Sequence, residues 1–314
     1  MDYKIGELIP TRLAYGQALA ELGAINKQIV VLDAEVKNST YAELFQKAFP
    51  ERFFEMFIAE QNMIGVALGL SKCGKIPFIS TFAAFLTRAF DQIRMAAYSQ
   101  PNLKICGSHA GVSIGEDGSS QMGLEDMAMM RALPGSMVLY PADAVATNKL
   151  IKLMADHQGL DYIRTTRPAT PVIYQNDAEF TLGGSQTLIQ SATDRLTIVA
   201  AGITLHQAII AADKLEKAQL PVRVIDAYSI KPLDIASLQT AAKATNNLVL
   251  TVEDHRIEGG LGEAVAGALA PFGIKVHCLG VDKIPDSGQA DELLAYENIS
   301  ANAIVRMIKS ILRL

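Results

Sequence analysis

The sequence predicts an α/β protein made of two doubly wound domains with mostly parallel sheets. Short apolar runs alternate with helix-like periodic segments along nearly all of the 314 residues, as βα units do. The alternation lapses after Arg167-Pro168, in a stretch rich in proline, asparagine, aspartate and glycine, and it resumes at Leu196. Apolar residues form 50% of the chain, enough to fill two cores. We therefore expect domains over 1–168 and 195–314, joined by a linker over 169–194.

The first domain is expected to alternate strands with helices, because each short apolar run is followed by a helical pattern. The predicted strands are Ile29–Leu32, Arg52–Met56, Phe78–Ser80, Leu103–Gly107, Met137–Tyr140 and Tyr162–Arg164. Several of the predicted helices end near glycine or proline. They are Thr11–Leu22, Tyr41–Phe49, Gln61–Lys72, Phe82–Ser99, Leu124–Ala132 and Ala144–Ala155.

The second domain repeats this alternation on a smaller scale. Its predicted strands are Leu196–Gly202, Val222–Asp226, Leu248–Val252 and Lys275–Leu279. Its predicted helices are His206–Lys217, Asp234–Ala242, Gly262–Ala270 and Ala301–Leu312.

Composition and charge exclude several classes of protein. A net charge of −5 without a Lys/Arg cluster argues against nucleic acid as a partner. No apolar run reaches the ~18–20 residues of a membrane helix, so no membrane span is expected. The N-terminal segment with Asp2, Lys4 and Glu7 does not resemble a secretory signal, and a cytoplasmic location follows. The three cysteines lack the spacing of metal ligands, and no metal site is predicted.

Glu60 is the first candidate for chemistry. It follows Phe57-Ile58-Ala59 and stands where a short apolar strand passes into a helix, so its carboxyl group is expected to be largely desolvated. An acidic residue is also common at a helix N-terminus, where the macrodipole favours it. From this residue alone both interpretations stay open.

Phe82 and Phe85 lie three residues apart in a predicted helix, which would place both rings on one face. Aromatic residues with this spacing usually belong to the core. His109 and Asp117 belong to a loop that follows a predicted strand, at the carboxyl edge of a parallel sheet, where ligand crevices form. A lone histidine after a strand more often makes a structural hydrogen bond, and Glu-Asp-Gly is a common turn.

Three segments, Phe57–Met63, Ser80–Phe85 and Gly107–Gly118, together resemble the pyrimidine-binding half of transketolases. Two later segments, Asp226–Asp234 and Thr251–Gly262, resemble the carboxyl-terminal domain of the same family. The resemblance implies thiamine diphosphate as cofactor, with its pyrimidine end bound here. It also implies that the chain takes part in moving a two-carbon ketol unit from a ketose phosphate to an aldose phosphate.

The resemblance also implies roles for individual residues. Glu60 would hydrogen-bond N1′ of the aminopyrimidine and drive cofactor activation. Phe82 and Phe85 would form an aromatic wall against that ring, with Gln121 as a polar contact.

The sugar substrate would be held by the remaining matched positions. Arg12, Ser39, His109 and Arg167 match residues that bind the phosphate end of the sugar, and Asp117 would orient the donor. Arginine suits phosphate because its planar fork donates two parallel hydrogen bonds. For any one of them alone, an exposed arginine or a capping serine is the commoner explanation, so the joint pattern carries the prediction.

A second polypeptide is expected. The family's Gly-Asp-Gly motif with its downstream asparagine does not occur here, so ligands for Mg²⁺ and the diphosphate are predicted on a partner, an N-terminal transketolase subunit. The predicted assembly is a heterotetramer of two long and two short chains, with this chain inactive alone.

Three alternatives remain. The β-subunit of a 2-oxo acid dehydrogenase decarboxylase is similar in size and architecture, but its substrate lacks a sugar phosphate. A 1-deoxyxylulose-5-phosphate synthase is normally one long chain. A non-catalytic protein of this fold could bind a partner or sugar phosphates. A metal at Glu253, Asp254 and His255 is disfavoured, because consecutive strand residues point to opposite faces.

Overall fold

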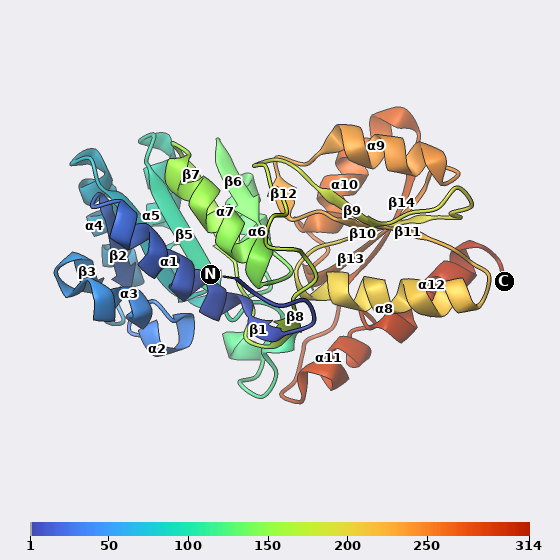
Figure 1. The fold of residues 1–314 in the computed structure, drawn as a ribbon, viewed down its shortest axis with the longest axis horizontal. Helices are drawn as coiled ribbons and strands as arrows, with labels where there is room; N and C mark the ends of the chain where they lie inside the picture. Colours follow the sequence, from blue (N-terminus) through green and yellow to red (C-terminus); the bar gives the residue numbers. More distant parts are fainter. Residues whose placement is uncertain (1) are drawn as a thin grey trace.

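The computed structural model describes residues 2–314 and confirms the α/β class. Two mostly parallel sheets stand side by side, one of seven strands and one of five (Figure 1). A separate antiparallel pair joins β1 (Leu8–Pro10) to β8 (Ala169–Pro171). Within residues 2–314 no helix has the length and apolar character needed to cross a membrane.

The first sheet has the strand order β12-β6-β7-β5-β4-β2-β3, and every neighbouring pair is parallel except β12 with β6. Its strands are β2 (Ile29–Asp33), β3 (Phe53–Glu55), β4 (Ile76–Phe82), β5 (Leu103–Ser108), β6 (Ser136–Leu139), β7 (Leu160–Arg164) and β12 (Ser229–Lys231). The central strands β4 and β5 are almost entirely buried, because helices cover both faces of the sheet.

Two layers of helices sandwich this sheet (Figure 1). The layers are α1 (Thr11–Ile25), α3 (Glu43–Ala48) and α7 (Ala144–Asp156) on one face, and α4 (Glu60–Lys72), α5 (Phe90–Tyr98) and α6 (Asp126–Ala132) on the other. Short turns connect them, namely α2 (Lys37–Thr40), η1 (Pro50–Arg52), η2 (Ala84–Ala89), η3 (Val112–Ile114) and η4 (Ser119–Gln121).

The second sheet has the order β14-β13-β10-β11-β9 and is parallel except at its edge strand β9. Its strands are β14 (Lys275–Val281), β13 (Leu248–Arg256), β10 (Thr197–Ala200), β11 (Arg223–Asp226) and β9 (Gln186–Ile189). Helices α8 (Ile203–Lys217) and α12 (Ala301–Ile311) cover one face, and α9 (Ile235–Ala244) and α10 (Leu261–Leu269) the other (Figure 1). The remaining elements of this half are the turn η5 (Ala270–Phe272) and the helix α11 (Ala290–Tyr296).

The predicted helix Phe82–Ser99 was wrong at its start. Phe82 is the last residue of β4, η2 follows, and α5 begins only at Phe90. Phe82 pairs with Ser108 of β5, and the Ala83 amide donates to the Ser108 carbonyl at 2.7 Å. This pairing with a strand distant in sequence extends the sheet through a segment whose local pattern is helical, because tertiary contacts override propensity.

The segment predicted as a linker contains two strands that the sequence analysis did not anticipate. Strand β8 pairs with β1, and β9 forms the antiparallel edge of the second sheet. Both pairings join residues far apart in the chain, which a local pattern does not reveal. Strand β12 similarly returns from the second half of the chain to the first sheet. The domain boundaries themselves stay a prediction.

Close packing at Gly16 sets the position of α1 against the turn that carries Ser39. A Cβ atom at Gly16 would lie 2.3 Å from the backbone oxygen of Tyr41. Gly16→Ala should therefore lower the free energy of unfolding by about 1–3 kcal/mol, measured by urea denaturation.

Gly69→Ala is the matched control, because Gly69 is an exposed residue of α4 with open space around it. This change should raise the free energy of unfolding by about 0.5–1 kcal/mol, since alanine is the better helix former. Equal stability of Gly16→Ala and the unchanged chain would contradict the close packing.

Candidate active site

Most of the side chains singled out from the sequence gather at one edge of the first sheet. Strands β2, β4, β5 and β7 all end there, because parallel strands share one carboxyl edge. The segments that follow these strands carry Ser39, Phe85, His109 and Arg167, and the helix α1 brings Arg12. A crevice at the carboxyl ends of parallel strands is the usual ligand position in such folds.

Glu60 occupies the first position of α4, as predicted, and only 2% of it is exposed. Its carboxylate lies 3.5 Å from Nη1 of Arg88. Phe57 and Ile58, just before it, are 64% and 72% exposed. A buried carboxylate therefore lies directly behind an apolar patch of surface.

A row of stacked groups extends from Glu60 to the centre of the sheet edge. The Arg88 guanidinium lies over the Phe85 ring, 5.2 Å from its centroid. Phe85 stacks on Phe82 with centroids 5.1 Å apart and an interplanar angle of 16°. Phe82 in turn stacks on the His109 imidazole at 3.9 Å and 13°. The two phenylalanines are thus partners, although by a strand end and a 3₁₀ turn rather than by one helix face.

His109 is almost completely buried and has a left-handed backbone, with φ of 55°. Its Nδ1 lies 2.9 Å from the Ser108 hydroxyl oxygen. Burial lowers the pKa of His109 to about 3, and the positive charges of Arg12 and Arg167 act in the same direction. The imidazole is therefore neutral near pH 7 and can exchange hydrogen bonds without adding charge.

Two arginines converge beside this histidine. Arg12 Nη1 donates to the Ser39 carbonyl at 2.7 Å, so Ser39 takes part through its backbone. Arg167 Nη1 donates to Asp117 Oδ1 at 2.9 Å and to the Ile114 carbonyl at 3.1 Å. Burial lowers the pKa of Arg12, and the nearby charge of Arg167 lowers it further. The fold thus brings two guanidinium groups to the same cavity, near enough for their charges to repel.

A cavity of about 290 Å³ opens between these arginines and the second domain. Arg12 Nε is buried and has no hydrogen-bond partner within residues 2–314. An unpaired buried donor in a cationic cavity suits an anionic ligand. The lining residues are Arg12, Ser113, Ile114, Gly115, Glu116, Arg167, Pro168, Gly288, Gln289 and Ala290.

Gln121 lies somewhat apart from these groups. It ends the turn η4, which packs against η2 and so reaches the neighbourhood of Phe85. Its side chain is partly exposed.

The sequence analysis overlooked two charged residues that shape this site. Arg88, the partner of Glu60, stands in the same segment as Phe82 and Phe85. Asp33 ends β2 fully buried, and its carboxylate accepts hydrogen bonds from the Val36 amide and the Thr40 hydroxyl, both at 2.7 Å. Burial raises the pKa of Asp33 to about 7. The sequence could have indicated Asp33, because it is a charged residue at the end of an otherwise apolar strand.

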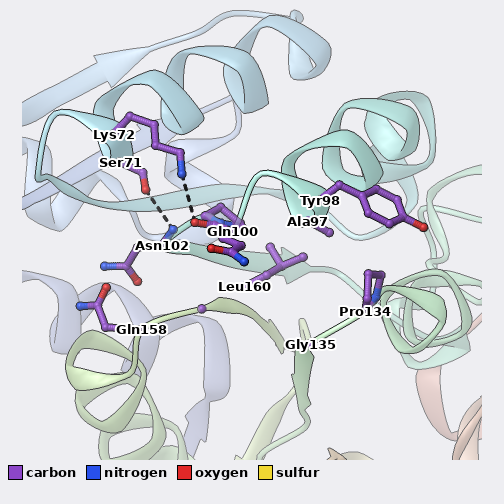
Figure 2. A pocket seen from close by; sticks show the side chains of 12 residues that line it. Ser71, Lys72, Ala97, Tyr98, Gln100, Asn102, Pro134, Gly135, Gln158 and Leu160 are labelled. Atoms are coloured by element: carbon purple, nitrogen blue, oxygen red, sulfur yellow. Dashed lines mark hydrogen bonds between the residues drawn. The ribbon is translucent and has the colours of Figure 1, made fainter.

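A larger cavity, of about 660 Å³, lies at the opposite edge of the same sheet (Figure 2). It is lined by the ends of α4 and α5 and by the segments that lead into β5, β6 and β7. Across it the Asn102 amide donates to the Ser71 hydroxyl at 2.9 Å. None of the side chains predicted from the sequence lines this cavity, so we assign the site to the carboxyl edge. Within residues 2–314 no cluster of three or more His, Cys, Asp or Glu side chains could hold a metal ion.

Comparison with known protein families gives matches over most of the chain. The model of the transketolase pyrimidine-binding domain matches residues 7–172. The model of the transketolase C-terminal domain matches residues 185–304.

Known relatives agree with these matches. Transketolase-like protein 2 of Mus musculus is 52% identical over 309 residues, which are 98% of this chain and 49% of the relative. Transketolase of Homo sapiens is 49% identical over 313 residues, 99% of this chain and 50% of the relative. The chain thus spans about half the length of the curated relatives it matches.

Two solved structures are also similar. One, described as "Split gene transketolase, inactive beta4 tetramer", is 43% identical with a TM-score of 0.88, and the alignment covers 98% of this chain and 99% of that chain. The transketolase of Campylobacter jejuni has a TM-score of 0.84 at 20% identity, over 98% of this chain and 47% of that one, and it shows the fold alone.

The His109 imidazole should remain neutral at pH 5, where an exposed histidine is protonated. Long-range ¹H–¹⁵N spectra report the tautomer, and His109→Gln identifies the signal.

The same burial predicts a pH dependence of stability. The unfolded chain takes up a proton on His109 near pH 6.5, whereas the folded chain does so only near pH 3. The free energy of unfolding should therefore decrease as the pH falls below about 6.5. The stability difference between the two chains should change accordingly between pH 7 and 4. An imidazolium signal from His109 at pH 5 would contradict the buried geometry.

Proposed function

This chain belongs to the transketolase family, and from that premise we propose that it works as one subunit of a split transketolase. The enzyme would transfer a two-carbon ketol unit from a ketose phosphate to an aldose phosphate. The observation that carries the proposal is the end-to-end similarity to the split gene transketolase chain, with 98% and 99% of the two chains aligned. The cytoplasmic location stays part of the proposal.

The residues present fit the pyrimidine end of thiamine diphosphate. A buried carboxylate at Glu60, connected through Arg88 to the stacked rings of Phe85 and Phe82, suits a flat heteroaromatic ring with a basic nitrogen. When bound, thiamine diphosphate supplies an electron sink that allows the bond beside a ketose carbonyl to break and form. Glu60 would hold a proton at the ring nitrogen N1′, and Gln121 would add a polar contact.

The cationic cavity supports a phosphorylated substrate. Arg12 and Arg167 offer forked donors to phosphate oxygens, and the neutral His109 can donate a hydrogen bond beside them. Ser39 contacts Arg12 through its carbonyl, and Asp117, which pairs with Arg167, would orient the donor. The 2-oxo acids that the β-subunit of a 2-oxo acid dehydrogenase would use carry no phosphate group for these donors.

A partner chain would complete the site. Phe57 and Ile58, just before Glu60, are large apolar side chains that the chain leaves more than half exposed, and Met95 and Tyr98 on α5 are exposed farther away, toward the opposite edge of the sheet. Exposed apolar groups of this kind are typical of an interface. We propose that an N-terminal transketolase subunit covers them and supplies the ligands for Mg²⁺ and the diphosphate, in a heterotetramer of two long and two short chains.

The decisive experiment is ketol transfer from xylulose 5-phosphate to ribose 5-phosphate with thiamine diphosphate and Mg²⁺. The chain is tested alone and in the complex that it forms with proteins of its source extract. We expect activity only in the complex. Full activity of the lone chain would refute the split enzyme, and inactivity of every complex would refute the assigned reaction.

Glu60→Ala in the active complex provides the residue-level test. Loss of the proton-holding group should lower turnover about 10²–10⁴-fold while assembly stays nearly intact. Glu216→Ala, which removes an exposed carboxylate of α8, is the control and should leave turnover unchanged. Undiminished turnover in Glu60→Ala would favour a non-catalytic role for this chain.

Arg167→Ala separates phosphate recognition from chemistry. Loss of a charge-assisted donor should raise KM for xylulose 5-phosphate about 10- to 100-fold, with a smaller effect on unphosphorylated xylulose. The control is Arg195→Ala, which removes an exposed arginine of the second domain. Equal losses with both donors would contradict a phosphate-binding role.

A further inference from the structure

The loop over residues 109–121, which carries His109 and Asp117, is held by a side chain of the second domain. Asp254 belongs to β13 and is fully buried. Its Oδ1 accepts a hydrogen bond from the Val112 amide at 2.7 Å, and its Oδ2 accepts one from the Ser113 amide at 3.2 Å. The contact therefore joins the second domain to the turn η3 in the middle of the site.

The backbone of the loop is shaped to admit this carboxylate. Gly111 has φ of +84°, and a Cβ atom there would lie 2.1 Å from Asp254 Oδ2. Glycine is required on both counts, because the backbone is left-handed and the space is already filled. Burial raises the pKa of Asp254, while the charge of Arg164 and the two amides oppose this effect. These neighbours thus stabilise the charged form of a carboxylate that water does not reach.

The two ends of the loop are held together by residues of the first domain. The Gly111 amide donates to the Gly123 carbonyl at 2.8 Å, which brings the two ends of the loop together. Arg164 Nη2 donates to the same carbonyl at 2.7 Å.

At the exposed tip of the loop, the second domain makes two further hydrogen bonds. The Ser287 hydroxyl donates to the Glu116 carbonyl at 2.6 Å, and the Gln289 side-chain amide donates to the Glu116 carboxylate at 2.7 Å. Asp254 is the buried and charged member of the contacts between the second domain and this loop.

We infer that Asp254 is a positioning residue for the substrate site, because its carboxylate fixes the η3 amides and thereby places His109 and Asp117. The second domain would then take part in substrate binding by setting the shape of this loop. Because His109 and Asp117 meet substrate only under the proposed function, the catalytic part of this role rests on it.

Glu253, the preceding residue, offers a matched control. It is also a buried carboxylate that accepts two backbone amides, those of Leu261 and Gly262 at 2.6 and 2.7 Å. Those amides begin α10 and do not belong to the loop. Glu253→Gln therefore imitates the loss of a buried, amide-binding carboxylate without touching the site.

Amide hydrogen exchange of the isolated chain tests the structural part of the inference without any need for activity. In Asp254→Asn one amide loses its acceptor and the charge is removed, so peptides spanning 109–121 should exchange on the order of 10- to 100-fold faster. Glu253→Gln should accelerate exchange at the start of α10 only. Unchanged protection of the loop in Asp254→Asn, or equal loss of loop protection in both variants, would overturn the inference.

Kinetics of the complex test the functional part. Asp254→Asn should lower kcat/KM for the ketose phosphate about 10- to 100-fold, mostly through KM, while the amount of assembled complex and the Glu253→Gln kinetics stay as in the unchanged enzyme. An active complex with unaltered kinetics in Asp254→Asn would overturn the role in binding. If the unchanged complex is itself inactive, the proposed function fails, and the exchange experiment still decides whether Asp254 positions the loop.

Discussion

The buried ion pair between Arg164 and Asp126 is the interaction on which the rest of the site depends. Both side chains are fully buried, with Arg164 Nε 2.9 Å from Asp126 Oδ2, and the guanidinium lies over the Tyr140 ring. Burying two charges costs several kcal/mol each, and further hydrogen bonds to the pair offset part of this cost. Here the Tyr162 hydroxyl donates to Asp126, and Gly123 accepts from Arg164 Nη2, while Arg164 Nη1 has no hydrogen-bond partner within residues 2–314. Removing one partner would leave a buried charge unpaired.

This pair fixes the end of β7 against the start of α6, and the loop over residues 109–121 is closed between them. The site beside it consists of two regions of different character. One is the aromatic row from Phe85 to His109 with the carboxylate of Glu60 at its end. The other is the cationic cavity of Arg12 and Arg167. Neutral His109 belongs to both, because it stacks on Phe82 while burial, and after it the charges of Arg12 and Arg167, lower its pKa.

The second domain contributes more to this site than its sequence suggests. In the sequence, Asp254 stands in the run Glu253-Asp254-His255, where a shared metal is disfavoured because neighbouring strand residues point apart. They do point apart, since Glu253 binds the start of α10 while Asp254 binds the loop of the first domain. The same alternation that argues against a shared ion lets one strand support two different elements.

The sequence by itself determined the alternating α/β elements and the position of Glu60 at the start of α4, because apolar periodicity and helix-terminal residues act over a few neighbouring positions. The resemblance to transketolases also singled out Arg12 and Arg167, which line the cationic cavity, though not their positions relative to one another. Only the tertiary structure decided that Phe82 closes a strand, that β8, β9 and β12 exist, that Arg88 lies beside Glu60, and that Asp254 binds the loop over residues 109–121. Each of these features depends on a contact with a residue distant in the chain. The local sequence pattern of one segment does not reveal such a contact, because its partner lies outside that segment.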